Sequence, residues 1–204
     1  MDAELRAGVA IYNAGEYHAA HDAWEERWLE LEDGTDDERF LHGLIQFTAA
    51  IYHAHNRNWA GATGLAESAL GYLDGLPDPY RDVRLDGVRT YLDVLADDPE
   101  VIERRDPPEL MWNGTALGLP ELEVDAAFLV ASVLAEEDDR WDESLVEDAV
   151  SYAREELDAA ETTFLTLVLD FVGDHENRGL IYQRLVEHVE RRKHREEDVD
   201  GLFE

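Results

Sequence analysis

His21 and Glu25 are the residues of this chain whose types and spacing best suit chemistry. They lie four positions apart, which in a helix puts both side chains on one face and within reach of each other. Imidazole titrates near neutral pH, so His21 is a candidate catalytic acid–base group and Glu25 a candidate group to orient it. A structural hydrogen bond that only fixes the imidazole is the alternative interpretation.

A second polar pair, Gln46 and His53, lies on a later helical segment. The two residues are seven positions apart and therefore share a helical face. Because Gln46 interrupts an apolar run, we expect its amide to be buried and to need a hydrogen-bond partner, for which His21 or Glu25 is the candidate. Trp28, Gln46 and His53 are thus candidate ligand-binding residues. Whether this cluster is a functional site or a structural network stays open at this point.

The imidazole and carboxylate donors of this cluster would suit a divalent ion such as zinc. Their spacing, however, matches neither His-Glu-x-x-His nor the paired Glu-x-x-His motifs of di-iron bundles, so we assign no metal ligands. The sequence has no dinucleotide-binding motif, no P-loop and no Gly-x-Ser-x-Gly motif of α/β-hydrolases. Whether the protein uses a cofactor stays unknown. The chain has no cysteine, which excludes disulfides, thiolate nucleophiles and cysteine-ligated metal clusters.

Helices account for most of the apolar periodicity. Thr35 with Glu38 forms the pattern of a capping box, and Asn58 can cap the following helix. No strand pattern is present, so we expect an all-α, compact helical bundle. The helices are predicted near residues 2–12, 16–31, 36–55, 58–75, 81–96, 122–137, 143–172 and 176–195.

Proline and glycine interrupt the pattern between residues 98 and 120. We therefore predict a helical domain at 1–97, an irregular packed junction at 98–120 and a C-terminal helical extension at 121–204. Apolar residues between 146 and 171 recur about every 3.5 residues, which is typical of an antiparallel bundle or a dimer seam. A homo-oligomer is thus allowed. Asp158 and Glu161 could cap a new helix, so one long helix or two stays open here.

The charge of the chain is its strongest compositional feature. Its 204 residues include 49 Asp plus Glu against 17 Lys plus Arg, for a formal net charge of −32. A hydrophobic content of 45% with five tryptophans argues against disorder. We interpret the composition as adaptation of a folded protein to high salt, where like charges are screened within a few ångströms. The charge also disfavours nucleic acid as a partner, since phosphate binding needs basic patches.

Hydropathy gives no indication of a membrane span. No apolar run approaches the roughly 20 residues that a span requires. The segment 1–6 carries acidic residues where a signal peptide would carry positive charge. We therefore expect a cytoplasmic protein without a membrane partner.

Several motifs together carry a resemblance to a known family. The segment 12–17 with Ala20 and Trp24 resembles half of a tetratricopeptide repeat, but it occurs once and predicts only a similar helical hairpin. Over residues 5–75 the chain resembles the family called domain of unknown function 309. The matching motifs are Tyr12-Asn13-Ala14-Gly15-Glu16-Tyr17, His21-Asp22-x-x-Glu25-x-x-Trp28, Phe40-Leu41-x-Gly43-Leu44-Ile45-Gln46, His53 and Asn58-x-x-Gly61-Ala62.

This resemblance implies a compact helical domain in which the histidine, glutamate, tryptophan and glutamine gather, and it implies no established reaction. Asp22 and Arg57 depart from the family pattern, where glutamate and glycine are usual. We expect a non-catalytic helical module that binds a small ligand or a protein partner. The alternative is a hydrolase, with or without a metal, that uses His21 as acid–base group.

Overall fold

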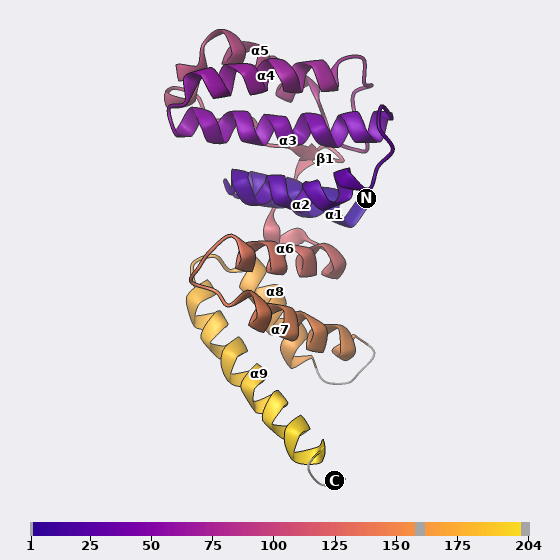
Figure 1. The fold of residues 1–204 in the computed structure, drawn as a ribbon, viewed down its shortest axis with the longest axis vertical. Helices are drawn as coiled ribbons and strands as arrows, with labels where there is room; N and C mark the ends of the chain where they lie inside the picture. The colour runs from indigo at the N-terminus through magenta and orange to yellow at the C-terminus, as the bar shows by residue number, and fades with distance from the viewer. Residues whose placement is uncertain (1, 158–161, 201–204) are drawn as a thin grey trace. The chain divides into compact units, whose positions relative to one another are not determined.

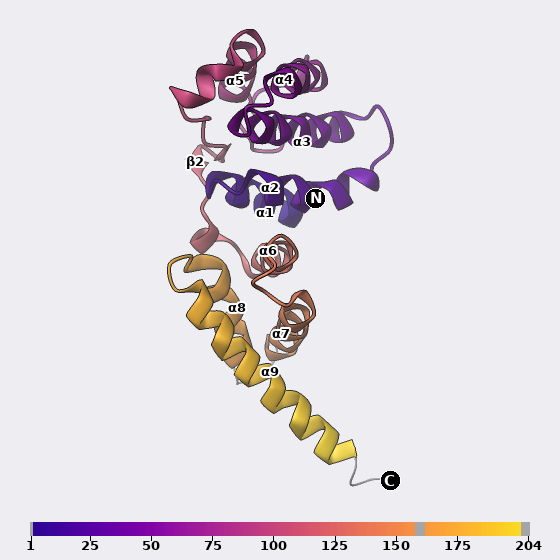
Figure 2. The same ribbon diagram turned by 60° about the vertical axis from the view of Figure 1, so that its left-hand side comes forward.

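The computed structural model describes residues 2–157 and 162–200, and it divides into two compact units at residues 1–122 and 123–204. The fold is all-α, as the sequence predicts (Figures 1 and 2). In the described residues, strands are limited to the short antiparallel pair β1 (Met111–Trp112) and β2 (Thr115–Ala116). Among these residues no helix combines the length and apolar character needed to cross a membrane.

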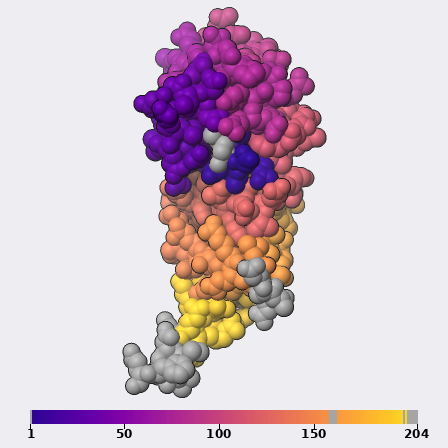
Figure 3. Space-filling model, turned by 90° about the vertical axis from the view of Figure 1, so that its right-hand side faces the viewer, coloured from indigo at the N-terminus to yellow at the C-terminus, as the bar shows by residue number. Residues whose placement is uncertain are grey.

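The first unit is built from helices that pack on their neighbours in sequence. α2 lies between α1 and α3, and α3 packs in turn against α4, as Figure 1 shows. In the space-filling view of Figure 3, side chains fill the gaps between the ribbons. The helices are α1 (Asp2–Asn13), α2 (Tyr17–Leu29), α3 (Asp36–His55), α4 (Trp59–Leu73) and α5 (Asp86–Asp97), with short 3-10 turns η1 (Pro99–Glu103) and η2 (Leu119–Glu121).

Trp24 anchors α2 on α1. Its ring is fully buried, and its Nε1 donates a hydrogen bond to the carbonyl of Leu5 at 3.3 Å. A Cβ at Gly8 would lie 2.1 Å from that Nε1. The ring can therefore lie on the backbone of α1 only because position 8 has no side chain. This contact fixes which face of α2 turns away from the core.

The caps that begin α3 and α4 agree with the sequence. Thr35 Oγ1 accepts the N–H of Glu38 at 3.2 Å, and the Asn58 side chain accepts the N–H of Gly61 at 3.2 Å. The capping box differs in one detail, because the Glu38 carboxylate returns to the N–H of Gly34 rather than to that of Thr35. Both helices therefore begin at the predicted residues.

α3 and α4 approach each other closely at Gly43. A Cβ at this position would lie 2.6 Å from Leu73 Cδ2, so only glycine allows the observed packing. The opposite face of α3 is then left to contact α2. The candidate site is formed between those two helices.

The segment 98–120 packs against α1 and its C-terminal turn. The Asn13 amide donates to the carbonyls of Leu110 at 3.0 Å and Leu117 at 2.9 Å, and accepts the N–H of Leu110 at 2.8 Å. Leu110 is fully buried.

One prediction about the helices of the first unit is wrong, because α5 begins at Asp86 rather than near 81. Arg81 and Asp82 have φ values of 46° and 65° and form a turn that no helix can include.

The second unit contains α6 (Val124–Glu136), α7 (Glu143–Glu156), α8 (Thr163–Gly173) and α9 (Arg178–Asp200). The region predicted at 143–172 is two helices, and the proposed caps Asp158 and Glu161 lie outside the described residues. α7 and α8 pack on each other. Most of the described apolar residues of the predicted 146–171 series are buried, but Leu157 is 48% exposed. Arg178 begins α9 and donates to the carbonyls of Phe171 and Val172, which caps the end of α8.

Candidate functional site

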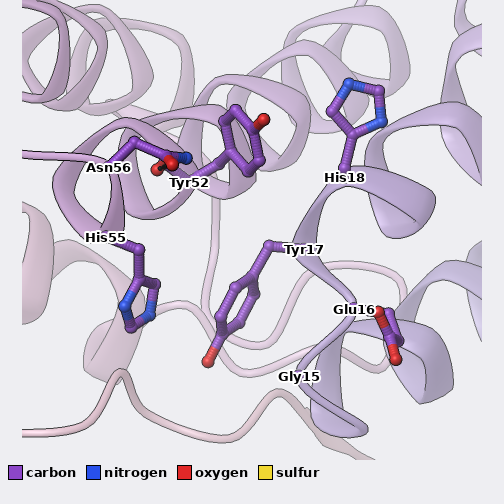
Figure 4. Close-up of a pocket in the computed structure, with 7 residues that line it drawn as sticks. All are labelled: Gly15, Glu16, Tyr17, His18, Tyr52, His55 and Asn56. Carbon is purple, nitrogen blue, oxygen red and sulfur yellow. Dashed lines mark hydrogen bonds between the residues drawn. The ribbon is translucent and has the colours of Figure 1, made fainter. Parts of the chain in front are cut away.

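A groove between α2 and α3 holds most of the candidate residues. A hollow of about 210 Å³ is lined by Tyr17, His18, His21, Ala49, Tyr52 and His53. A second hollow of about 450 Å³ shares Tyr17, His18 and Tyr52 with the first and adds Gly15, Glu16, His55 and Asn56. We call the two hollows together the α2–α3 groove. Figure 4 shows the larger one, with the start of α2 on one side and the end of α3 on the other.

Aromatic rings form the walls of this groove. The Tyr17 and His55 rings stack with centroids 5.5 Å apart, and the His18 and Tyr52 rings meet edge to face at 5.4 Å. Tyr52 has a large exposed area, with 44% of its surface accessible. The exposed Tyr52 ring offers apolar surface to a ligand. Burial raises the pKa of Tyr17, and the charge of Asp106 adds to the effect, so its hydroxyl stays protonated.

His21 lies at the edge of the smaller hollow with a carboxylate at each nitrogen. Its Nδ1 is 3.1 Å from Asp22 Oδ1, and its Nε2 is 4.0 Å from Glu25 Oε1. The His21 side chain is 29% exposed, so solvent reaches it. The predicted helical pair is thus within reach, but the closer carboxylate belongs to Asp22. Asp22 also contacts His18, whose Nδ1 is 3.3 Å from Asp22 Oδ2.

His53 is held by the cap of the next helix. Asn58 Oδ1 accepts the N–H of Gly61, so its Nδ2 is the atom that meets His53 Nδ1 at 2.7 Å. The amide nitrogen donates, hence Nδ1 of His53 accepts and the ring proton lies on Nε2. His53 therefore lines the smaller hollow with its Nδ1 engaged by Asn58.

Trp28 belongs to a different cluster at the other end of the same helix pair. Its Nε1 donates to Glu38 Oε1 at 2.9 Å, and its ring lies 4.4 Å from that of His42. His42 Nδ1 is 3.2 Å from the same Glu38 oxygen, and its ring stacks on Tyr72 at 3.8 Å. The residues Trp28, Glu38, His42 and Tyr72 form what we call the Glu38 cluster. Trp28 therefore does not line the groove with His21 and His53.

Glu38 is a buried carboxylate, with only 9% of the residue exposed to solvent. Burial alone would raise its pKa, but hydrogen bonds from Trp28, the Gly34 N–H and His42 outweigh that effect and lower the pKa below its ordinary value. The carboxylate is thus charged and satisfied. This arrangement ties the α2–α3 connection to α3, and the stacking of His42 on Tyr72 extends it to α4.

Gln46 lies on α3 between the two clusters. It shares a helical stripe with His42, Ala49 and His53. Its side chain is half-buried rather than buried, and it makes no hydrogen bond to any residue that the structure describes. Because its amide keeps contact with solvent, it does not need the partner that we expected from the sequence.

The sequence reasoning missed Tyr17, His18 and Tyr52, which the structure adds to His21 and His53. A signal existed for His18, because it lies three residues before His21 and four before Asp22 on one helical stripe. Chemically, the smaller hollow offers imidazoles and phenols but no serine, threonine or other alcohol nucleophile. A hydrolytic reaction there would use water, with His21 oriented by Asp22.

Comparison with known proteins supports the resemblance found in the sequence. Residues 5–65 match the model of the family described as a domain of unknown function (DUF309). The matched residues contain most of α1, all of α2 and α3 and the first part of α4, so they include the lining of the α2–α3 groove and every residue of the Glu38 cluster except Tyr72. An uncharacterized protein of Aquifex aeolicus (strain VF5) is 28% identical over 109 residues, which is 53% of this chain and 32% of that protein. The match therefore spans about a third of the relative's length.

Proposed function

We propose that the first unit is a binding module whose α2–α3 groove takes a small ligand with a planar ring. The observation that carries this proposal is the convergence of His18, His21, His53, Tyr17 and Tyr52 from two helices around one opening. Ligand sites are typically concave, mostly apolar and provided with a few polar groups that fix orientation. The larger hollow has a volume in the range of such sites.

Ring stacking and one directed hydrogen bond would hold the ligand. The exposed Tyr52 ring supplies a stacking surface, and the N–H at Nε2 of His53 supplies a donor for a ring nitrogen or carbonyl. The acidic residues Glu16 and Asp22 near the opening favour a neutral or cationic ligand over an anionic one.

Ala49 allows a direct test, because it lines the smaller hollow with an apolar methyl group that takes part in no hydrogen bond. Ala49→Leu should fill the hollow while leaving the polar residues in place. The matched control is Ala60→Leu, at an exposed position of α4. The probe is a set of imidazoles, indoles and nucleobases, and the readout is amide chemical-shift change in the full-length protein.

We expect at least one ring compound to shift the amides of residues 17–21 and 49–56. This response should be lost in Ala49→Leu and retained in Ala60→Leu. The proposal is wrong if no compound shifts these amides, or if filling the hollow changes nothing. Docking of a protein partner on the same face would instead leave the small compounds silent, and it would contradict the small-ligand proposal.

The alternative function is hydrolysis, which one observation favours. His21 reaches the opening and has Asp22 at its Nδ1, the arrangement in which a carboxylate orients an imidazole base. We would test it with p-nitrophenyl acetate and bis-p-nitrophenyl phosphate, comparing the wild type with His21→Gln and with His175→Gln, at an exposed position outside the groove. Hydrolysis that His21→Gln abolishes and His175→Gln retains would support the enzyme. Equal rates in all three would exclude these reactions at His21.

A further inference from the structure

One face of α2 carries four side chains of the kinds that bind transition metals. His18, His21, Asp22 and Glu25 occupy helix positions i, i+3, i+4 and i+7, which form a single stripe. The sequence motifs for known metal sites do not include this pattern, so it passes unnoticed until the side chains are placed. Trp24, buried on α1, fixes the rotation of the helix and hence the direction of the stripe.

The donor atoms of three of these residues are close enough for a single ion. One donor atom from each of His21, Asp22 and Glu25 lies within 4.8 Å of the other two. A tetrahedral zinc ion with bonds of about 2.0–2.2 Å holds its donors roughly 3.3 Å apart. The shortest distances involve different nitrogens of His21, since Nδ1 is 3.1 Å from Asp22 Oδ1 and Nε2 is 4.0 Å from Glu25 Oε1. One ion binds only one of these nitrogens, so a side chain must turn to bring both carboxylates to the same nitrogen.

Glu25 can close the remaining gap by rotation of its side chain. Its side chain is 46% exposed, so it keeps room to change rotamer. Asp22, by contrast, is already oriented, because one oxygen faces His21 Nδ1 and the other faces His18 Nδ1 at 3.3 Å. Ligands that are held by an outer hydrogen bond in this way are typical of metal sites in proteins.

The charge and the atom types both select a divalent transition metal. Two carboxylates and a neutral imidazole supply two negative charges, which balance a divalent cation. The net charge of −32 raises the local concentration of cations further. One nitrogen with two oxygens suits zinc or manganese better than calcium or magnesium, which prefer oxygen alone.

We propose that α2 binds one divalent transition-metal ion, best matched by zinc, through His21, Asp22 and Glu25. His18 acts as a positioning residue that orients the Asp22 carboxylate. Three protein ligands leave a coordination position for water or for a ligand. The site stands on α2 alone and does not depend on the proposed ligand binding in the α2–α3 groove.

Zinc itself is the probe for the test. The full-length protein is freed of metal with a chelator and then titrated with zinc in competition with a chromophoric chelator, at fixed high salt. The decisive pair of variants is Glu25→Gln and Glu26→Gln, since both remove one charge from neighbouring positions of the same helix. Glu26 is exposed and is no part of the stripe.

We expect one tight zinc ion per chain. Glu25→Gln should weaken binding by at least about tenfold, and His18→Gln should weaken it by about tenfold through the outer hydrogen bond. Glu26→Gln should bind zinc as the wild type does. A melting curve recorded without metal checks that each variant is folded. Because the Glu25 side chain is 46% exposed, Glu25→Gln should fold and test the proposal even if a variant at His21 does not fold.

Two outcomes would overturn the proposal. The first is several weak ions per chain whose affinities fall equally in Glu25→Gln and Glu26→Gln, which would indicate a diffuse acidic surface. The second is no zinc binding at all. Ala49→Leu, which removes no metal ligand, should keep zinc, so failure of the groove proposal and failure of the metal proposal are distinguishable.

Discussion

Replacing Glu38 by glutamine should destabilise the first unit, because it removes a buried charge that three donors satisfy. The donors are Trp28 Nε1 at 2.9 Å, His42 Nδ1 at 3.2 Å and the Gly34 N–H at 3.3 Å. The amide keeps one acceptor oxygen for Trp28 and His42, but its NH2 group then faces the donor of Gly34. One charge-assisted bond is lost and two are weakened.

Hydrogen bonds to charged groups contribute about 1.5–3 kcal/mol each to stability. Losing one and weakening the others gives an expected cost of about 2 kcal/mol in the free energy of unfolding. Domains are commonly stable by only about 5–15 kcal/mol, so the change should be plain in a denaturant titration. Trp28→Phe, which removes one donor to the charged carboxylate, should cost about 1.5–3 kcal/mol.

The pH dependence gives the prediction a second test. The pKa of Glu38 is lowered from its ordinary value of 4.5 in the folded state. A depressed carboxyl pKa contributes stability that is present above the unfolded pKa and lost as the pH falls through the folded pKa. The difference between the wild type and Glu38→Gln should therefore be constant near neutral pH and shrink below pH 4.5.

Tryptophan fluorescence during urea unfolding is the assay, in a Trp141→Phe background. Trp141 is the only tryptophan of the second unit, so the remaining emission reports on the first. Glu67→Gln, at an exposed position of α4, is the matched control. The reasoning is refuted if Glu38→Gln lowers the stability no more than Glu67→Gln does. It is also refuted if the difference in stability between the wild type and Glu38→Gln does not depend on pH.

Two further predictions follow from packing and from charge. Gly8→Ala should lower the free energy of unfolding by about 1–3 kcal/mol through overpacking and shift the Trp24 emission, because the new Cβ would lie 2.1 Å from the ring. Gly64→Ala, with open space around it, should instead stabilise the protein by up to about 1 kcal/mol. Equal shifts of the melting temperature in the two variants would contradict this prediction. Raising potassium chloride from ~0.1 M to ~1 M shortens the screening length from about 10 Å to about 3 Å, which weakens the repulsion between like charges. Calorimetry should therefore record a higher melting temperature at ~1 M salt. A melting temperature that stays constant or falls would argue against adaptation of this chain to high salt.

Local signals in the sequence predict the starts of α3 and α4 well, for a physical reason. Thr35 and Asn58 cap the helices through bonds to residues only three positions away, so the pattern does not depend on the rest of the fold. The reach between His21 and Glu25 is local in the same sense. The turn at Arg81 and Asp82 escaped prediction, because Arg81 gives no sign of a positive φ and the aspartate at 82, which tolerates one, also suits the start of a helix.

The composition of the clusters depends on how the helices cross, which spacing along one helix does not encode. Trp28 shares a helical stripe with His21, yet its indole meets Glu38 and His42 because α3 approaches that turn of α2. Gln46 lies in an apolar run, but the packing of α3 leaves it only half-buried. Tyr52 escaped attention because an exposed tyrosine becomes a binding surface only when a second ring lies beside it.

The double role of Asn58 makes the hydrogen-bonding polarity of the neutral His53 ring depend on a single atom. Its oxygen begins α4, while its nitrogen decides which His53 nitrogen holds the proton. Asn58→Asp would preserve the cap, since aspartate caps helices equally well. It would also replace the donor at His53 Nδ1 by an acceptor, so the neutral ring would move its proton to Nδ1 and offer a lone pair to the groove. A ligand preference could thus be inverted from the turn between two helices, without changing any residue of the groove wall.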